Sequence, residues 1–273
     1  MRFMFAWARH LHARSPMRRR LWIGIPALLV VTIGFFEPVT AFCVVVLSSV
    51  IVFGSALRRS SDFYVKLLRR SPRNLECVAL TFDDGPDPVR TPQILEVLDR
   101  AQAKATFFMI GRRAEQAPEL VRRVIDAGHE IGSHTYSHPR TIPFWRAESQ
   151  RREVVNGIAA LEAKSKVPIR WFRPPMGLAT PALARALAGV PVEPVNWSVH
   201  SRDLGDPHED RIASRVLAGV RGGDIVLMHD GSDRLGEGPA ALPAALERIL
   251  NGLRERRLRA VTLSELVDDP GAH

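Results

Sequence analysis

Cysteine is almost absent from this chain of 273 residues, which contains only Cys43 and Cys77. Cys43 lies in an apolar run and Cys77 in a predicted core strand, so we do not expect the two to form a disulfide. They provide neither a disulfide framework nor a cysteine-rich metal site. They also leave the redox compartment open, because neither position is diagnostic of an oxidising or a reducing environment.

An excess of basic over acidic residues is missing from most of the chain, although the formal net charge is +9. Residues 1–73 contain twelve Lys and Arg against Glu37 and Asp62, whereas residues 74–273 contain 26 basic and 27 acidic residues. The larger part is therefore close to neutral, and it gives no reason to expect the concentrated basic surface that binds nucleic acid. It also lacks internal repeats and low-complexity tracts.

Two apolar runs dominate the N-terminal part, at residues 21–36 and 39–57, with a Glu-Pro dipeptide between them. The first is slightly shorter than the roughly 20 residues that a membrane-spanning helix needs, and the second is long enough. Arginines flank the pair at 18–20 and at 58–59. The apolar region is too long for a signal peptide and no clear small-x-small cleavage site follows it, so we predict a membrane-embedded helical segment.

The topology of this anchor stays open. Basic residues at both outer ends favour a hairpin, spanning or re-entrant, that keeps the rest of the chain in the cytoplasm. One tilted span with the main domain outside is the alternative. Residues 62–73 mix apolar and basic side chains like an amphipathic helix on a membrane surface, or like an ordinary linker helix. We predict that residues 1–73 anchor the chain in the inner (cytoplasmic) membrane and contact lipid, and that residues 74–273 form the main domain.

Strand and helix patterns alternate in the main domain, and a frayed end is expected over 268–273. Apolar runs that suit buried strands lie at 77–82, 105–110, 129–133, 171–173, 190–197, 224–228 and 259–262. Helical periodicity fills the gaps at 92–101, 118–127, 147–164, 181–187, 210–217 and 242–257. Repeating strand–helix units predict an α/β fold with a parallel sheet, and their number favours a barrel over a small open sheet.

The first candidate site is the stretch Thr-Phe-Asp-Asp-Gly-Pro at 81–86, which holds Asp83 and Asp84 where a predicted strand ends. Reactive groups collect at such strand ends in α/β domains. Two neighbouring carboxylates repel each other, so an economical reason for the pair is a cation that binds one of them. The other carboxylate would then be free to act as a base.

Candidate partners for that cation follow the third predicted strand, in the stretch Ser-His-Thr-Tyr-Ser-His-Pro at 133–139. His134 and His138, together with one carboxylate, fit a divalent metal site with coordination positions left open, as in catalytic zinc centres. Two loop histidines that make ordinary hydrogen bonds would show the same spacing. The acidic pair at the end of another strand favours the metal site.

These two motifs, in this order, resemble the polysaccharide deacetylase family (NodB homology, carbohydrate esterase family four), and the resemblance covers roughly residues 75–265. It implies a distorted (β/α) barrel of the NodB-homology type. It also implies that Asp83 is the catalytic base and that Asp84, His134 and His138 hold a divalent metal. Zinc is the metal that fits best, with cobalt or another divalent ion as alternatives.

A third motif, Arg-Pro-Pro-Met-Gly at 173–177, matches the family's arginine that orders the base. The resemblance implies that Arg173 pairs with Asp83 and keeps it ionised. The family usually has tyrosine where this chain has Met176, whose backbone N–H would stabilise the oxyanion. The chemistry can therefore survive the change, while the surface that faces the substrate is altered.

By the same resemblance, the fourth and fifth motifs contain the general acid and the carboxylate that tunes it. In the stretch 197–204, Asp203 aligns with the acid that tunes the catalytic histidine, and Trp197 is implied to face the substrate. His200 stands where an aspartate is usual and Leu204 where a tryptophan is usual, so the sugar-binding groove differs from the usual one. In the fifth motif, Leu-Met-His-Asp, the resemblance makes His229 the general acid and Leu227 part of the acetyl-methyl pocket.

The sequence thus predicts a membrane-attached, metal-dependent hydrolase that removes N-acetyl groups from an amino-sugar glycan. If the main domain faces the cytoplasm, a lipid-linked amino sugar that loses an acetyl or formyl group is the alternative substrate. A third possibility is a non-catalytic sugar-binding barrel, which the intact base and metal-ligand positions disfavour. The predicted partners are an N-acetylated sugar and membrane lipid, without nucleic acid.

Overall fold

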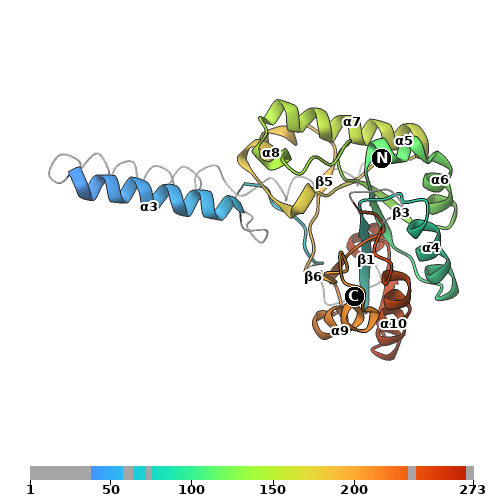
Figure 1. The fold of residues 1–273 in the computed structure, drawn as a ribbon. Helices are drawn as coiled ribbons and strands as arrows, with labels where there is room; N and C mark the ends of the chain where they lie inside the picture. The colour runs from blue at the N-terminus through green and yellow to red at the C-terminus, as the bar shows by residue number, and fades with distance from the viewer. Residues whose placement is uncertain (1–37, 58–63, 72–75, 233–237, 269–273) are drawn as a thin grey trace. The chain divides into compact units, whose positions relative to one another are not determined.

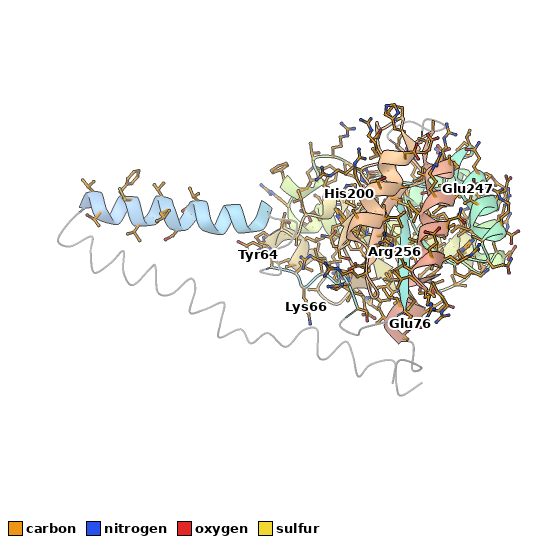
Figure 2. All side chains as sticks on the ribbon, turned by 90° about the horizontal axis from the view of Figure 1, so that it is seen from below. Tyr64, Lys66, Glu76, His200, Glu247 and Arg256 are labelled. Atoms are coloured by element: carbon orange, nitrogen blue, oxygen red, sulfur yellow. The ribbon has the colours of Figure 1, made fainter. Side chains whose placement is uncertain are left out.

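The computed structural model describes residues 38–57, 64–71, 76–232 and 238–268. Its first helix, α3 (Pro38–Leu57), coincides with the second apolar run, and its side chains are described at 39, 40, 42–50 and 54. Those side chains project from both sides of the helix (Figure 2). Within the described residues, no helix is both long and apolar enough to cross a membrane. The first apolar run and both arginine flanks lie outside the described residues.

The helix predicted over 62–73 does not form in its described part, residues 64–71. Leu68 N donates to Pro194 O at 3.1 Å, and Leu68 O accepts from Asn196 N at 2.7 Å. Ser71 N donates to Gly223 O at 2.7 Å. The backbone here is extended because its polar groups find partners along the sheet, and Leu67 is buried. This stretch therefore packs on the main domain before residue 74.

The main domain alternates strands and helices in the predicted order (Figure 1). The strands are β1 (Cys77–Asp83), β2 (Thr106–Met109), β3 (Glu130–Ser133), β4 (Trp171–Phe172), β5 (Glu193–Pro194), β6 (Val199–His200), β7 (Ile225–His229) and β8 (Arg259–Val261). The helices are α4 (Arg90–Arg100), α5 (Gly111–Gln116), α6 (Pro118–Asp126), α7 (Ala147–Ser165), α8 (Pro181–Ala186), α9 (Glu209–Gly219), α10 (Leu242–Glu255) and α11 (Leu263–Asp268). Two short 3₁₀ turns, η1 (Ile142–Phe144) and η2 (Pro175–Gly177), complete the set in the described residues.

The strands form one parallel sheet in the order β5-β4-β3-β2-β1-β7-β6, with β8 also paired to β1. Among the described strands, β5 and β6 end this order and do not pair with each other. The sheet is therefore an open half-barrel, less closed than the predicted barrel. Its end strands have two residues each, too few for a continuous ladder.

Four described elements differ from the sequence prediction. Helix α5 and strand β6 were not predicted, and β5 is much shorter than the predicted run 190–197. Helix α11 occupies residues up to Asp268, where a frayed end was expected to begin, and residues 269–273 lie outside the described part. The short β5 includes Pro194, whose nitrogen cannot donate to a neighbouring strand.

Strand β1 forms the centre of the core, and all seven of its residues are buried. It is paired on both sides, with Asp83 opposite Phe108 on β2 and opposite His229 on β7. Side chains alternate along a strand, so Thr81 and Asp83 share a face, and the same register places Leu227 and His229 on that face of β7. The register thus brings the predicted base and the predicted acid to neighbouring strand ends.

Candidate active site

Asp83 is held by a fully buried arginine. Arg173 Nη1 donates to Asp83 Oδ1 at 2.6 Å and to Thr81 Oγ1 at 2.8 Å, and Nη2 donates to Asn196 O at 3.2 Å. The guanidinium also lies 4.1 Å from the centre of the Phe108 ring. Burial lowers the pKa of Arg173, and the adjacent Asp83 counteracts that shift. The predicted pair between Arg173 and Asp83 therefore forms in the structure.

Asp84 turns towards the two histidines. His134 Nε2 and His138 Nε2 each lie 3.5 Å from Asp84 Oδ1, and His134 Nε2 lies 3.8 Å from Asp83 Oδ2. One ligand atom from each of Asp84, His134 and His138 lies within 4.8 Å of the other two. The three predicted ligands are therefore close enough to share one ion.

The residues present fit a divalent cation. Asp84 Oδ1 is buried and has no hydrogen-bond partner in the described structure, so a polar atom is left for an ion to satisfy. His134 Nδ1 lies 2.8 Å from Arg173 O, an acceptor that fixes the proton on Nδ1 and leaves the Nε2 lone pair free. Burial, with His138 nearby, lowers the pKa of His134 to about 3, which keeps the ring neutral. Two imidazoles and one carboxylate form a typical zinc donor set.

His229 forms a buried pair with Asp203. Its Nδ1 lies 2.9 Å from Asp203 Oδ1, and its backbone N–H donates to Asp203 Oδ2 at 2.8 Å. Ser201 Oγ donates to Asp203 Oδ1 at 2.6 Å. Burial lowers the pKa of His229, but the charge and hydrogen bond of Asp203 outweigh it and raise the pKa to about 9. The imidazolium form can therefore persist at neutral pH.

Residues with positive φ concentrate in the loops that carry these groups. Asp84, Thr135, His138, Met176 and Arg202 have φ angles of 73°, 68°, 53°, 58° and 54°. Positive φ is unusual for residues other than glycine, and for a β-branched residue such as Thr135 it is a genuine outlier. Such strain persists only where the surrounding structure enforces it, and it clusters at functional sites.

Comparison with known proteins agrees with this geometry. Residues 70–195 match the family described as polysaccharide deacetylase. A peptidoglycan-N-acetylglucosamine deacetylase of Bacillus cereus is 39% identical over 198 residues, which are 72% of this chain and 90% of that protein. The chain belongs to the polysaccharide deacetylase family. A chitooligosaccharide deacetylase of Sinorhizobium fredii is 37% identical over 199 residues, 71% of this chain and 93% of that protein.

Solved structures of the family share the fold. The Bc1960 peptidoglycan N-acetylglucosamine deacetylase superposes with a TM-score of 0.70 at 32% identity, over 74% of this chain and 92% of that one. A pseudoenzyme of the same family (CE4) from Bacillus anthracis gives a TM-score of 0.67 at 26% identity, over 74% of this chain and 68% of that one. The fold therefore occurs in an enzyme and in a pseudoenzyme, so an argument for activity has to rest on the residues of the site and not on the fold.

The predicted substrate residues of the family lie around the same site. The guanidinium of Arg173 lies 5.8 Å from the centre of the Trp197 ring, and Leu227 is buried on the face that carries His229. Met176 follows Arg173 by three residues in the η2 turn. The roles of Met176, Trp197 and Leu227 towards a substrate stay predictions, as do the catalytic and metal roles.

His200, which stands where an aspartate is usual in the family, lies beside His229, the predicted general acid. Its ring centre lies 5.9 Å from that of His229 and 5.6 Å from that of Trp197, and Figure 2 labels its side chain. Arg202 N donates to His200 Nδ1 at 3.0 Å. The substitution therefore brings a fourth imidazole to the edge of the site, beside those of His134, His138 and His229.

Sequence reasoning missed the residues that hold the site loops from behind. Arg113 on α5 is buried; it donates from Nη1 to Asp84 O at 2.6 Å and from Nη2 to Ser232 O. It thus joins the loop of a metal ligand to the loop that follows His229. On the far side of the metal-ligand loop, Glu153 on α7 accepts from Ser137 N and Ser137 Oγ, both at 2.8 Å.

Asp230, which follows His229 in the sequence, is a fully buried carboxyl that the prediction did not use. Thr91 Oγ1 donates to Asp230 Oδ2 at 2.6 Å, while Oδ1 has no partner in the described structure. Burial, together with the nearby charges of Asp84 and Asp87, raises the pKa of Asp230 to about 7, and the hydrogen bond from Thr91 opposes the shift. A side chain at Gly85 would collide with this carboxyl, since an added Cβ would lie 2.1 Å from Oδ2.

Proposed function

We propose that the chain is a metal-dependent hydrolase that removes N-acetyl groups from an amino-sugar glycan. One observation carries the proposal: the adjacent carboxylates of Asp83 and Asp84 face different partners. Asp83 forms an ion pair with Arg173, whereas Asp84 Oδ1 lies 3.5 Å from Nε2 of both His134 and His138. Such a division leaves one carboxylate for a metal and one for proton transfer, as a hydrolytic centre requires.

A divalent cation held by Asp84, His134 and His138 would supply Lewis-acid polarisation of the amide carbonyl and acidify the attacking water. Asp83 takes the proton from that water, and Arg173 holds the carboxylate in place. Zinc suits two imidazoles and one carboxylate, and cobalt is an alternative.

His229 completes the reaction on the leaving-group side. Because Nδ1 is bonded to Asp203, Nε2 is the nitrogen available to donate a proton to the departing amine. An amine leaves poorly unless it is protonated, so a protonated His229 is needed at the moment of cleavage. The Met176 backbone N–H is the proposed donor to the oxyanion.

The proposal extends to membrane attachment through residues 1–57. Its support is the pair of apolar runs in the sequence, with arginines outside both. In the second run, large apolar side chains on α3 are exposed, including Val39 at 72% and Phe42 at 69%. Apolar surface of this kind needs a lipid or protein environment. The side of the membrane that the main domain faces decides which substrate it meets.

A lipid-linked amino sugar at the inner leaflet is the second candidate substrate. Met176 and Leu204 favour it, because they replace the tyrosine and tryptophan usual in the family's glycan groove. The third candidate, a sugar-binding barrel without activity, has a precedent in the Bacillus anthracis pseudoenzyme. It is disfavoured because Asp83, Asp84 and both histidines lie within reach of one another.

The test is acyl release by the full chain, stripped of metal and then refilled with zinc or cobalt. Substrates are N-acetylated sugar oligomers and an N-acylated lipid-linked amino sugar. Acetate released from the oligomers only after refilling supports the glycan deacetylase. Release from the lipid-linked compound alone favours the second candidate. If the metal-loaded chain releases no acyl group from either substrate, the proposed activity is contradicted.

A further inference from the structure

A second hollow of the main domain lies at the end of the sheet opposite the candidate active site. It is a pocket of about 490 Å³, within the range of small-molecule sites. Residues 101–104, the end of α10 and strand β8 line most of it. Strand β8 pairs with the first three residues of β1, whereas Asp83 is the last residue of β1. The pocket is therefore separate from the catalytic residues.

The pocket combines an apolar floor with a basic rim. Leu250, Leu253 and Val261 are buried and form part of the floor. Although the main domain is close to neutral as a whole, the charged lining consists of four basic side chains and one acidic: Lys104, Arg254, Arg257, Arg259 and Glu265. Basic side chains attract phosphate groups, and the apolar floor suits the hydrocarbon that carries a phosphate. The lining therefore fits an amphiphilic anion.

Two of the charged side chains in the lining are already engaged. Lys104 Nζ donates to Ala127 O at 2.7 Å. The Glu265 carboxylate accepts from Thr262 N at 2.8 Å, and Glu265 N donates to Thr262 Oγ1 at 3.2 Å, which is a capping box at the start of α11. The one acidic group of the lining is thus held by its own helix. It does not neutralise the rim by an ion pair within the described residues.

The three arginines of the rim have no such partners. Arg254, Arg257 and Arg259 are exposed, and their side chains make no hydrogen bond or ion pair in the part of the chain that the structure describes. Each guanidinium presents several N–H donors in a fixed fork that matches the oxygens of a phosphate. The rim therefore offers three sets of donors to an anionic ligand.

The end of α10 presents Arg257 from a position where glycine is usual. Leu258 N donates to Leu253 O at 2.9 Å and Arg257 N donates to Arg254 O at 3.0 Å, the hydrogen-bond pattern of a Schellman motif. Arg257 is the left-handed residue of this motif, with a φ of 59°. Glycine is favoured there because it has no Cβ to strain. The backbone alone therefore gives no reason for an arginine at this position.

Helix electrostatics explain only part of the arginine cluster. Basic side chains are favourable in the last turn of a helix, where Arg254 lies. The effect falls off beyond that turn, and Arg259 belongs to β8, with its backbone N–H donated to Glu76 O at 2.9 Å. The arginines thus meet around the pocket from two elements, which the stability of α10 does not require.

The chain enters the main domain at the same end of the sheet. Ser71 N donates to Gly223 O at 2.7 Å, and Gly223 N donates to Cys77 O at 2.8 Å. Cys77 is opposite Arg259 in the register of β1 and β8. The rim of the pocket is therefore close in the sheet to the segment that follows the proposed membrane anchor. An anionic lipid surface supplies phosphate groups on apolar bodies to this position.

We propose that this pocket binds the headgroup of an anionic phospholipid, with the arginines on the phosphate and the upper hydrocarbon over the apolar floor. The main domain then has a membrane contact of its own, besides residues 1–57. The inference uses the proposed membrane attachment and does not depend on the proposed deacetylation. It leaves the end of the sheet that carries Asp83 and His229 facing away from the bilayer.

The experiment compares Arg257→Gly with Lys166→Gly in the full chain, held in micelles of a neutral detergent. Lys166 is an exposed basic residue at the end of α7, has a φ of 61° and does not line the pocket. Each variant removes one positive charge at a left-handed position that accepts glycine, so both should fold. The twelve basic residues of 1–73 are unchanged in both variants, so their contribution to lipid binding cancels.

Dihexanoyl phosphatidylglycerol is titrated calorimetrically, with dihexanoyl phosphatidylcholine and inorganic phosphate as comparison probes. Arg257→Gly should raise the Kd for phosphatidylglycerol about 5-fold, and Lys166→Gly should leave it unchanged. Phosphatidylcholine should bind the unchanged chain more weakly. Equal Kd values in the two variants would overturn the site. Inorganic phosphate that binds as tightly as phosphatidylglycerol, and more weakly to Arg257→Gly, would overturn the lipid in favour of a free anion.

Turnover separates this inference from the proposed function. Arg257→Gly should release acetate from water-soluble N-acetylated oligomers at the rate of the unchanged chain, because the pocket and the catalytic residues lie at opposite ends of β1. A fall in this rate equal to the loss of lipid affinity would overturn the separation of the two sites. Lipid binding is measured without substrate, so its outcome stands whether or not the chain is a deacetylase.

Discussion

At the scale of single residues, the site depends on the adjacent carboxylates of Asp83 and Asp84 having different partners. Asp83 and Asp84 are adjacent, yet Asp84 has a φ of 73° and its carboxylate lies beside His134 and His138, whereas Asp83 pairs with Arg173. Two neighbouring carboxylates repel each other, so different partners for the two reduce this repulsion. The left-handed residue at the strand end thus makes two different functions available from one dipeptide.

The His229–Asp203 pair predicts a specific pH effect. Burial alone lowers the pKa of His229, and Asp203 raises it to about 9. In Asp203→Asn the raising contribution is lost, so His229 should give up its proton at lower pH. The alkaline limb of the pH profile of kcat/KM should then move to lower pH. Asp210→Asn, which removes a carboxylate from an exposed ion pair, is the control and should leave the profile unchanged. An unshifted limb would mean that His229 is not the acid.

The same pair affects stability with a definite sign. His229 has a raised pKa in the folded chain, so its contribution to the free energy of unfolding is fully present below about pH 6.5. It is lost as the pH rises through about 9. The free energy of unfolding of the metal-free chain, measured with denaturant, should therefore fall between about pH 6.5 and about pH 9. In His229→Gln it should fall less over the same pH range. Equal pH dependence in both proteins would contradict the assignment.

Substitution of Arg113 should change the affinity for the metal, although Arg113 is not one of the predicted metal ligands. It donates to Asp84 O, so Arg113→Met should loosen the loop that carries a ligand. Groups that orient ligands from outside typically change metal affinity by about 10- to 100-fold. The dissociation constant is measured by chelator competition. Arg112→Met is the control, because Arg112 is exposed, and it should leave the affinity unchanged.

The residues of the proposed site could be picked out from the sequence, whereas the residues that hold their loops could not. Asp83, Asp84, His134 and His138 are marked by residue type and spacing beside predicted strand ends. Arg113, Glu153 and Asp230 act on backbone groups or buried hydroxyls that are distant in sequence, and no spacing rule connects them to those partners. Only the folded arrangement shows which of Arg112 and Arg113 is buried.

At the scale of elements, α7 supports the metal-ligand loop through one close approach. A Cβ at Gly157 would lie 2.6 Å from the carbonyl carbon of Thr135. Alanine normally stabilises a helix relative to glycine by about 1 kcal/mol. We predict the reverse here: Gly157→Ala should destabilise the chain by about 1–3 kcal/mol, because backbone on both sides cannot yield. Urea unfolding measures this, with Val155→Ala as the exposed control.

A stabilised Gly157→Ala chain with intact metal affinity would contradict this account of α7. The helix would then be a passive cover over the sheet. Its contacts to Ser137 and Thr135 would have no influence on the ligand loop.

The elements differ in how far the sequence predicts them. Strands β1, β2 and β7 were predicted because each contains a run of buried apolar residues. Strands β5 and β6 are two residues long and are defined by pairing partners, which no local pattern reveals. Residues 64–71 have the composition of an amphipathic helix, but hydrogen bonds to residues 194, 196 and 223 determine an extended course.

At the scale of the whole molecule, the charge and the apolar surface are divided along the chain. The basic excess and both long apolar runs belong to residues 1–73, and the near-neutral remainder carries the site. Because Leu68 and Ser71 pair with the main domain, the part that folds as one unit extends before residue 74. Attachment and catalysis are therefore expected to be separable by truncation at the right place.

A pair of truncations tests this division. A chain that begins at residue 58 should leave the membrane fraction and keep the thermal stability of its main domain. A chain that begins at residue 74 should also be released but melt at lower temperature, because the pairing at Leu68 and Ser71 is lost. Both are followed by fractionation and thermal unfolding. Retention of the first chain in washed membranes would contradict attachment through residues 1–57.

The most direct test of the central claim is bound metal, measured together with turnover, in Asp83→Asn and Asp84→Asn. Both are isosteric changes in adjacent residues, so each serves as the control for the other. Asp83→Asn should keep its metal while turnover falls about 10²- to 10⁴-fold, as expected for loss of a general base. Asp84→Asn should lose both metal and turnover. Loss of metal from Asp83→Asn, or full turnover in Asp84→Asn, would contradict the division of the acidic pair.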